Sequence, residues 1–193
     1  MTGLRAGERC EIDAGATISY EYDSDAGRTR IGDDATVRHG TIIYGDVRIG
    51  DGFVTGHDAI IREHTTIGDD VLVGTKTVID GRSEIGDDVS MQTGVYVPTE
   101  TTIGDDVFLG PHAVLTNDPY PLRTDHDVVG PTIEDGVSLG ANTTILPDVT
   151  VGARSFVAAG AVVTEDVPPD CLAVGAPARF RELPPELRGG NGR

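Results

Sequence analysis

Apolar and polar positions alternate along most of this chain with a period of six. An aliphatic residue opens each hexad and a small or β-branched residue holds its fifth position, as in Ile31 and Ala35. The tripeptide Ile-Gly-Asp recurs from Ile31 to Ile103, and each start follows the last at the same interval (49 − 31 = 18). A period of six with β-branched residues does not fit the 3.6-residue period of a helix, so we predict short strands. The interval equals three hexads, so the predicted unit is a three-sided coil.

The two inward positions, one large and one small, predict a narrow prism with turns of Gly and Asp at its corners. The hexads run from Ile12 to residue 168, and residues 169–180 are expected to close the open end. We therefore predict a single β-helix domain over residues 12–180, preceded by a lead-in of residues 1–11. The tail, residues 181–193, is expected to hold a short helix and a frayed end.

The repeat is interrupted once, by an extra segment. Its phase resumes at Ile133 instead of Pro121, which leaves residues 121–132 as an addition of two hexads' length (133 − 121 = 12). We predict that this segment is a loop inserted into a continuous stack of about eight coils. At about 4.8 Å for each coil, such a stack is on the order of 40 Å tall.

Candidate chemistry gathers at this interruption. His112 occupies the fourth, outward-facing position of its hexad, and Asn117 and Asp118 follow where the coil breaks. Asn, Asp and Pro also favour turns at a chain reversal, so a purely structural role stays open for these residues. We interpret the stretch from Leu109 to Thr132 as a functional loop carried by a scaffold.

Composition restricts the partners and the compartment. The formal net charge is −17, and Lys76 is the only lysine. Such a surface repels nucleic acid and anionic lipid. Cys10 and Cys171 are too few for a disulfide framework, and no apolar leader or run of roughly 20 apolar residues is present, so we expect a cytoplasmic protein with no membrane span. Abundant Asp with almost no Lys favours a halophilic source over a merely acidic mesophilic one, because molar salt shortens the Debye length to about 3 Å.

The hexad [LIV]-G-x-x-x-x resembles that of the hexapeptide-repeat acyltransferases, and the resemblance covers about residues 28–181. The segment GANTTILPDVTVGARSFVAAGAVVTEDVPPDCLAVGAPAR resembles the C-terminal signature of that superfamily. The segment GPHAVLTNDPYP resembles, more narrowly, the nucleotide-sugar amino N-acetyltransferases and related sugar O-acyltransferases. The resemblance implies an all-β, left-handed parallel β-helix, although the general crossover rule would favour the other hand. It also implies a homotrimer that holds acetyl-CoA in a groove between two subunits.

The resemblance further implies roles for individual residues. Asn117 is expected to contact a sugar amine, with His112 or Asp118 as the base that removes its proton. Candidates for contacting the acceptor are Thr116, Tyr120 and Arg123. Small residues that would let the pantetheine arm approach the backbone are Gly140, Ala141, Ala158, Ala159 and Gly160. Arg154 and Arg179 are the cations expected near the CoA phosphates. For the small residues, turn geometry and packing are the structural alternative, and for Arg179 a solvated cap.

Three alternatives remain. Many hexapeptide O-acetyltransferases resemble one another in a Thr-x-x-His arrangement, but Thr116 is followed by Asn-Asp-Pro, which favours an amine acceptor. A γ-class carbonic anhydrase shares the fold, and His39 and His57 are three hexads apart, with His64 on the next face. That family pairs two histidines as His-x4-His, which is missing here, so we expect no metal. A scaffold β-helix would need no loop at a single coil.

We therefore predict an enzyme that transfers an acetyl group from acetyl-CoA to the amine of a nucleotide-linked sugar, in surface glycan biosynthesis. The sugar, the nucleotide and the length of the acyl chain stay open.

Overall fold

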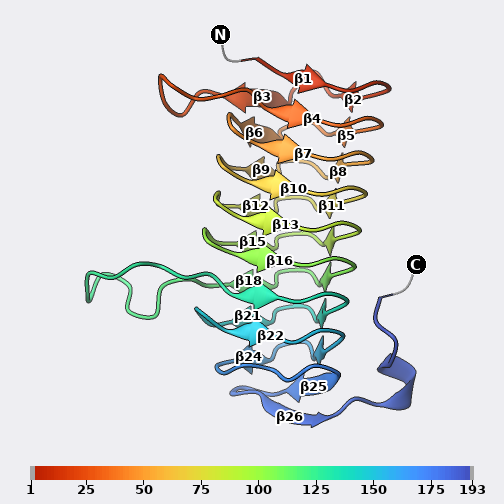
Figure 1. Ribbon diagram of the computed structural model, residues 1–193, viewed down its shortest axis with the longest axis vertical. Helices are drawn as coiled ribbons and strands as arrows, with labels where there is room; N and C mark the ends of the chain where they lie inside the picture. Colours follow the sequence, from red (N-terminus) through yellow and green to blue (C-terminus); the bar gives the residue numbers. More distant parts are fainter. Residues whose placement is uncertain (1–2, 192–193) are drawn as a thin grey trace.

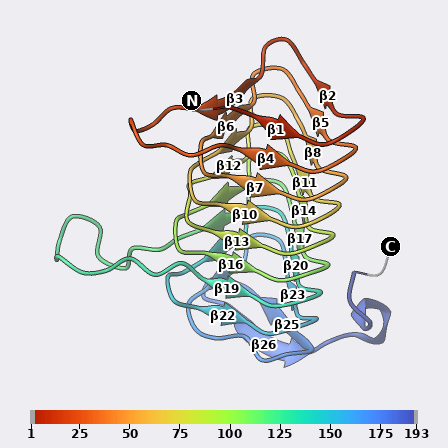
Figure 2. The ribbon, with the colours of Figure 1, turned by 45° about the horizontal axis from the view of Figure 1, so that its top comes forward.

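The repeat folds into a three-sided prism of very short parallel strands. A computed structural model describes residues 3–191 of the chain, so the outermost parts of the predicted lead-in and tail lie outside the described residues. Its strands form three sheets, one for each face of the prism, and up to β24 successive strands along the chain belong to successive faces (Figures 1 and 2). The fold class predicted from the sequence is confirmed.

Sheet A consists of β1 (Arg5–Ala6), β4 (Arg30–Ile31), β7 (Arg48–Ile49), β10 (Thr66–Ile67), β13 (Glu84–Ile85), β16 (Thr102–Ile103), β19 (Thr132–Ile133) and β22 (Thr150–Val151). Sheet B consists of β2 (Glu11–Ile12), β5 (Thr36–Val37), β8 (Val54–Thr55), β11 (Leu72–Val73), β14 (Ser90–Met91), β17 (Phe108–Leu109), β20 (Ser138–Leu139), β23 (Phe156–Val157), β25 (Cys171–Val174) and β26 (Arg179–Glu182). Sheet C consists of β3 (Thr17–Tyr20), β6 (Ile42–Tyr44), β9 (Ile60–Ile61), β12 (Val78–Ile79), β15 (Tyr96–Val97), β18 (Val114–Leu115), β21 (Thr144–Ile145) and β24 (Val162–Val163).

At both ends the prism extends beyond the limits predicted from the hexads. The first coil already begins at β1, which pairs with β4 and lies inside the segment 1–11 that the pattern leaves out of the repeat. At the other end β26 pairs antiparallel with β25 and extends to Glu182, past residue 180. The tail then forms one short 3-10 helix, η1 (Pro185–Leu187), and returns along sheet B.

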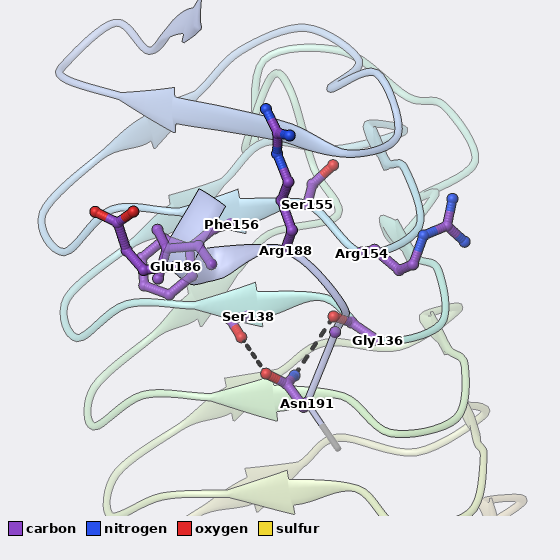
Figure 3. Close-up of a pocket in the computed structure, with 10 residues that line it drawn as sticks. Gly136, Ser138, Arg154, Ser155, Phe156, Glu186, Arg188 and Asn191 are labelled. Atoms are coloured by element: carbon purple, nitrogen blue, oxygen red, sulfur yellow. Dashed lines mark hydrogen bonds between the residues drawn. The ribbon is translucent and has the colours of Figure 1, made fainter. Parts of the chain in front are cut away.

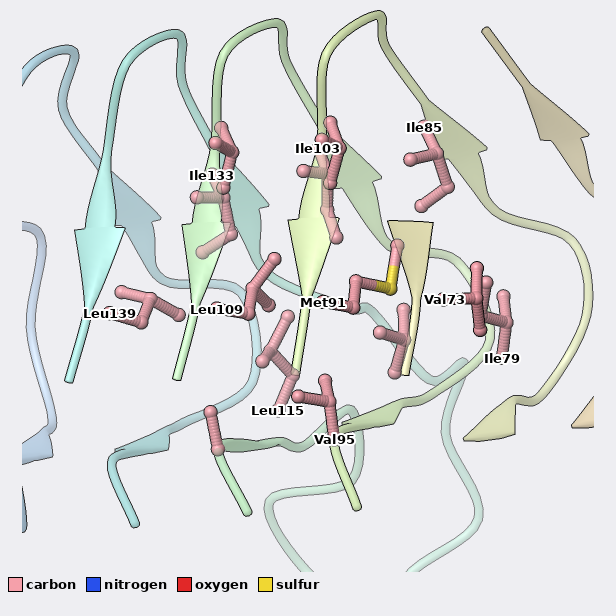
Figure 4. Close-up of a cluster of buried hydrophobic side chains, with 14 of the residues drawn as sticks. Val73, Ile79, Ile85, Met91, Val95, Ile103, Leu109, Leu115, Ile133 and Leu139 are labelled. Carbon is pink, nitrogen blue, oxygen red and sulfur yellow. The ribbon is translucent and has the colours of Figure 1, made fainter. Parts of the chain in front are cut away.

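The core follows the two inward positions of the hexad. Ile103, Leu109 and Leu115, one from each sheet, are at most 2% exposed, and equivalent residues from neighbouring coils stack on them (Figure 4). In one coil the usual sizes of the two inward positions are reversed. The large Phe53 holds a fifth position, and the smaller Thr55 holds the first position of the next hexad. Both are at most 1% exposed. A large fifth residue therefore packs where the first is small, which conserves the core volume.

The fourth position of the hexad explains the high content of Asp. Its backbone takes the left-handed conformation at the corners, with φ of 58° at Asp34, 58° at Asp58 and 56° at Asp106. Asp, Asn and Gly tolerate this conformation better than other residues do. Corner geometry thus accounts for part of the net charge of −17.

The third position adds a second set of aspartates, stacked along the corner between sheets A and B, hereafter corner AB. Oδ1 of Asp51 accepts the N–H of Asp33 at 2.7 Å, and Oδ1 of Asp69 accepts the N–H of Asp51 at 2.7 Å. The series continues through Asp87, Asp105 and Asp135. Each carboxylate therefore binds a corner N–H of the preceding coil that has no partner in a strand.

The extra segment leaves the ladder intact. Thr132 and Ile133 of β19 lie opposite Thr102 and Ile103 of β16, in the same register that β16 keeps with β13. This coil is therefore longer than its neighbours by two whole hexads, and the predicted insertion is confirmed. The loop leaves the prism at the corner between sheets C and A (Figure 1). Within residues 3–191 no helix is both long and apolar enough to cross a membrane.

We predict that Asp69→Ala lowers the free energy of unfolding by about 1–2 kcal/mol, because the Asp51 N–H loses a charged acceptor. Asp69→Asn keeps an acceptor oxygen and should retain most of that stability. Urea unfolding of the two variants beside the parent measures the difference. Equal losses in both variants would show that the carboxylate contributes charge and not a hydrogen bond.

Candidate functional site

The loop that interrupts the repeat begins at the corner between sheets C and A, hereafter corner CA. Thr116, Asn117 and Asp118 follow β18 directly and are partly buried, whereas Tyr120 and Arg123 lie further out and are exposed. Thr116 Oγ1 donates to the carbonyl oxygen of Ile145 at 2.9 Å, which holds the start of the loop against the next coil. The loop therefore leaves the prism from a fixed base.

Asn117 is oriented by the coil before it. Its Nδ2 donates to Thr99 Oγ1 at 2.9 Å and to the Thr99 carbonyl oxygen at 3.2 Å. Its backbone carbonyl accepts the N–H of Val129 at 3.0 Å, which ties the two ends of the loop together. With both amide hydrogens used, the side-chain oxygen of Asn117 is the group left to meet a ligand, and it can only accept.

Asp118 and His126 fasten the loop to itself. Asp118 Oδ1 lies 3.1 Å from His126 Nε2 and accepts the N–H of Tyr120 at 2.8 Å. The other ring nitrogen, His126 Nδ1, lies 3.0 Å from Thr124 Oγ1. Tyr120 packs edge-on against the His126 ring, with 5.9 Å between the ring centres. Both nitrogens of His126 are thus engaged inside the loop.

Apolar side chains are exposed along this loop. Tyr120 is 59% exposed, Leu122 is 103% exposed and Val129 is 44% exposed. The loop extends well away from its own prism in both ribbon views (Figures 1 and 2). Its outer part therefore contacts little of the chain that carries it.

His112 lies at a different corner, the one between sheets B and C, hereafter corner BC. It holds a fourth position with φ of 59°, and its ring is exposed, as the sequence predicts. The ring makes no hydrogen bond or ion pair with any residue from 3 to 191. Gly94 of the preceding coil lies beneath it, and a Cβ there would come within 2.4 Å of His112 Nδ1. A side chain at residue 94 would therefore displace the imidazole.

The small residues predicted to bind the pantetheine arm lie at the same corner, in the coils that follow. Gly140 and Ala141 come after β20, and Ala158, Ala159 and Gly160 come after β23. At corner AB the matching third-position N–H groups are bonded to aspartates. Within the described chain, the N–H groups of Ala141 and Ala159 have no such partner. They are available donors.

Glycines keep these two donors open. A Cβ at Gly110 would lie 2.6 Å from the Ala141 nitrogen, and a Cβ at Gly140 would lie 2.4 Å from the Ala159 nitrogen. Coil stacking alone therefore demands glycine at both places, and the same absence of a side chain leaves the corner accessible. Gly140 is thus required for the stacking of the coils and also fits the predicted approach of the pantetheine arm.

The two predicted phosphate-binding arginines are separated. Arg154 lies at corner AB and forms a two-point pair with Asp170, at 2.8 and 2.7 Å. The hydrogen bond from Arg154 lowers the pKa of Asp170. Arg179 begins β26 and is exposed, and within residues 3–191 its guanidinium donates only to the carbonyl oxygen of Ala178, at 3.0 Å. Of the two, Arg179 is the cation that remains available.

The tail makes a small pocket beside Arg154, about 140 Å³ in volume (Figure 3). Asn191 fills the inner side: its Oδ1 accepts from Ser138 Oγ at 2.6 Å, and its Nδ2 donates to the Val137 carbonyl oxygen at 2.9 Å. Phe156 and Arg188 line the outer side. The pattern of hexads gave no indication of this contact, because the tail carries no repeat.

The predicted residues thus occupy three corners of one chain. Asn117 with the loop, His112 with the small residues, and Arg154 each lie at a different corner of the prism. Sequence reasoning missed Thr99, which lies one coil before Asn117 and orients it. It also missed the network of Tyr22, Asp46 and His64 at corner CA. No group of three or more ligating side chains suited to a metal ion occurs in residues 3–191.

Models of two hexapeptide-repeat families match parts of the chain. Residues 130–165 match the bacterial transferase hexapeptide (six repeats), and residues 64–98 match the hexapeptide repeat of succinyl-transferase. Both segments lie within the stacked coils.

Curated proteins match over short segments. The bifunctional protein GlmU of Rubrobacter xylanophilus is 47% identical over 60 residues, which are 31% of this chain and 13% of GlmU. A 2,3,4,5-tetrahydropyridine-2,6-dicarboxylate N-acetyltransferase of Staphylococcus aureus is 46% identical over 56 residues, 29% of this chain and 23% of that protein. The aligned segments thus span less than a quarter of these relatives.

Solved structures match over more of the chain. A histidine-to-alanine variant of GDP-perosamine N-acetyltransferase from Caulobacter crescentus, in complex with CoA and GDP-perosamine, is 30% identical with a TM-score of 0.58, covering 65% of this chain and 55% of that one. A UDP-N-acetylglucosamine acyltransferase from Bacteroides fragilis shares the fold at 19% identity, with a TM-score of 0.65 over 88% of this chain and 73% of that one. The stacked hexads and these matches together show that the chain has hexapeptide repeats and the left-handed parallel β-helix fold, and that it is similar to the hexapeptide-repeat acyltransferases.

Proposed function

We propose that the protein is a homotrimeric acetyltransferase that moves the acetyl group of acetyl-CoA to the amino group of a nucleotide-linked sugar. Support comes from the GDP-perosamine N-acetyltransferase structure with CoA, which is 30% identical. The role in surface glycan biosynthesis rests on the sugar acceptor and is part of the proposal.

The proposal that the acceptor is an amine rests on the orientation of Asn117. Thr99 takes both of its amide hydrogens, so its Oδ1 faces a ligand as an acceptor. An amine can donate one hydrogen to that oxygen and still direct its lone pair at the acetyl carbonyl. A hydroxyl that donates its only hydrogen there must lose it to a base before it becomes a strong nucleophile. The site therefore suits an amine better.

In the proposed reaction the amine nitrogen attacks the thioester carbonyl, the C–N bond forms, and the C–S bond breaks. CoA leaves as a thiolate and takes up a proton, while the nitrogen gives one up. His112 is the best candidate for handling that proton, because its ring nitrogens are exposed and unpaired within residues 3–191. Asp118 and His126 bond to each other, so we assign them to holding the loop.

Acetyl-CoA is proposed to lie along corner BC. The free N–H groups of Ala141 and Ala159 are one coil apart, about 4.8 Å, and can bind carbonyl oxygens of an extended pantetheine arm. Gly110 and Gly140 let the arm approach. Arg179, near the last coil, is then placed for the CoA phosphates, and Arg154 is already paired with Asp170.

A shared site between subunits follows from the separation of corners BC and CA. His112 and Asn117 belong to different corners of one prism, so the proposed site takes one residue from each of two chains. Outward residues of sheets B and C support such packing, because many are apolar: Val54, Leu72 and Phe108 on sheet B, and Ile42, Ile60, Val78, Tyr96 and Val114 on sheet C. Phe156 of sheet B is not among them, because the chain's own tail lies beside it. The outward residues of sheet A are Arg, Thr and Glu. Two apolar faces and one polar face suit a closed ring of three.

A thiol-release assay tests the function directly. We expect acetyl-CoA to be consumed with amino sugars linked to a nucleoside diphosphate, and faster than with the free amino sugars. The matched neutral sugar nucleotides, which carry a hydroxyl in place of the amine, should give little turnover. Faster turnover with the hydroxyl compounds would replace the proposal by sugar O-acetylation.

Three single variants separate the roles within the site. Asn117→Ala and His112→Ala should each lower kcat/KM by about a hundredfold or more, because one removes the contact to the amine and the other the base. Thr99→Val should cause a smaller loss, since Asn117 remains but is held by the Thr99 carbonyl alone. Glu84→Gln, exposed on sheet A, is the control and should keep full activity. Wild-type rates in the first two variants would remove this assignment.

Mixing the two inactive variants tests the shared site. If each site takes Asn117 from one chain and His112 from the next, random trimers of Asn117→Ala and His112→Ala restore about one quarter of the sites. Activity should therefore rise after the two proteins are unfolded and refolded together. If every site lies within one chain, the mixture stays as inactive as its components, although its mass is still that of a trimer.

A further inference from the structure

An arginine-lined cleft lies at the N-terminal end of sheet A, beside corner CA. Its volume is about 440 Å³, and it is lined by Gly27, Arg28, Arg30, Asp46, Arg48, His64 and Thr66. These residues come from successive passes of the chain, from the loop after β3 to the start of β10. The loop that carries Asn117 leaves the same corner three coils further on, about 14 Å along the prism. The cleft is therefore separate from the proposed acetyl-transfer site.

The arginines of the cleft stand directly beside one another. Arg30 and Arg48 are register partners in neighbouring parallel strands, and Arg5 is the register partner of Arg30 on its other side. Neighbouring strands lie about 4.8 Å apart, and like charges placed opposite each other in a sheet destabilise it. The arrangement therefore carries an electrostatic cost in the empty protein.

Several other arginines form ion pairs with acidic side chains, whereas the arginines of the cleft form none among the described residues. Arg9 pairs with Asp34 at 2.6 Å, Arg62 with Glu63 at 2.8 Å, and Arg188 with Glu182 at 2.6 Å. For Arg28, Arg30 and Arg48 no ion pair occurs among residues 3–191. Acidic side chains outnumber basic ones by 32 to 15, so partners are abundant in this chain. Three guanidinium groups without an ion pair in the described residues thus lie together in the cleft.

The single carboxylate in the lining is already bound by the chain itself. Asp46 Oδ2 accepts the N–H of Gly27 at 2.8 Å and the hydroxyl of Tyr22 at 2.8 Å. The Gly27 N–H, followed by the Tyr22 hydroxyl and the charges of His64 and Arg48, lowers the pKa of Asp46. His64 Nε2 lies 3.1 Å from the Tyr22 hydroxyl. Burial, together with the bond to Asp46, raises the pKa of Tyr22 to about 12. This network fixes the wall of the cleft and leaves the guanidinium groups to face solvent.

We propose that this cleft binds the diphosphate group of a small anionic molecule. A guanidinium fork can bind a phosphate through two parallel N–H donors, and Arg30 and Arg48 present two such forks from adjacent strands. Arg28 adds a third cation, and the Thr66 hydroxyl, the register partner of Arg48, adds a neutral donor. A bound diphosphate also removes the repulsion between the arginines. The proposal stands without the acetyl-transfer function.

Calorimetric titration of the full chain at moderate ionic strength tests this proposal. Inorganic diphosphate, a nucleoside diphosphate and CoA are titrated separately, with sulfate as a single-anion control. We expect tighter binding of at least one diphosphate compound than of sulfate, and the ranking of the three identifies the source of the group. Failure of all three to bind more tightly than sulfate would overturn the proposal.

Variants locate the binding. Arg30→Gln combined with Arg48→Gln should weaken diphosphate binding by on the order of a hundredfold, about tenfold for each charged hydrogen-bonding group. Without ligand the same variant should melt at the parent's temperature or slightly above it, since a repulsive pair is lost. This melt separates lost binding from lost folding. Arg82→Gln, an exposed arginine at corner CA outside the cleft, is the matched control and should bind like the parent.

Two outcomes would contradict the assignment. Equal binding by the parent and the double variant would place the anion elsewhere. A double variant that changes the molecular mass of the assembly while leaving diphosphate affinity intact would make the arginines part of a contact between chains. Acetyl-transfer activity is measured in parallel on the acceptor panel, so the proposed function and the cleft fail or hold independently.

Discussion

The hydrogen bonds from each coil to the next hold this protein together. Most strands are only two residues long, too short to be stable alone, and each is bonded to its neighbours in the stack. Because the repeat is in strict register, equivalent residues lie on top of one another along the whole prism. At the inward positions and in several outward columns, a side chain therefore lies beside residues of its own kind, and neighbouring coils must accommodate the same contact repeatedly.

The columns solve that problem differently. The inward columns stack aliphatic residues, which pack well on their own kind (Figure 4). The aspartates at corner AB stack like charges, but each carboxylate accepts a backbone N–H that would otherwise be unbonded. The column of Arg5, Arg30 and Arg48 has no such internal solution. The stacked arginines therefore differ from the other columns. Because no group of the described chain pairs with them, we propose that the cleft binds an external anion.

Corners are where the fold accepts change. An extra residue within a strand disrupts the pairing locally, as between β3 and β6, whereas the loop after Thr116 adds the length of two hexads and β19 still pairs in register with β16. Chemistry that departs from the repeat is therefore found at corners. His112, the free N–H groups of Ala141 and Ala159, and Asn117 all lie there. The strands between them determine their spacing.

The period of six predicted the prism, its eight coils, the stacked core and the length of the insertion, because each depends on a pattern repeated many times. It could not predict contacts that occur once. The pairing of Asp118 with His126, the capture of Asn191 by Ser138, and the network around Tyr22 involve segments without repeats. The start of the first coil at Arg5 was missed for the same reason, since residues 5–11 carry too little pattern to show that they already pair with the stack.

The candidate site likewise combines residues that the sequence identified with contacts that the sequence could not predict. Sequence reasoning selected Asn117, but its usefulness as an acceptor depends on Thr99, which binds both amide hydrogens from one coil away. It also treated Asn117 and His112 as neighbours because they are close in sequence. In a three-sided coil, one hexad carries the chain from one corner to the next, so proximity in sequence here means separation in space. A site that uses both residues therefore has to join two corners, and in the proposed trimer the outward apolar residues of sheets B and C would bring those corners of two chains together.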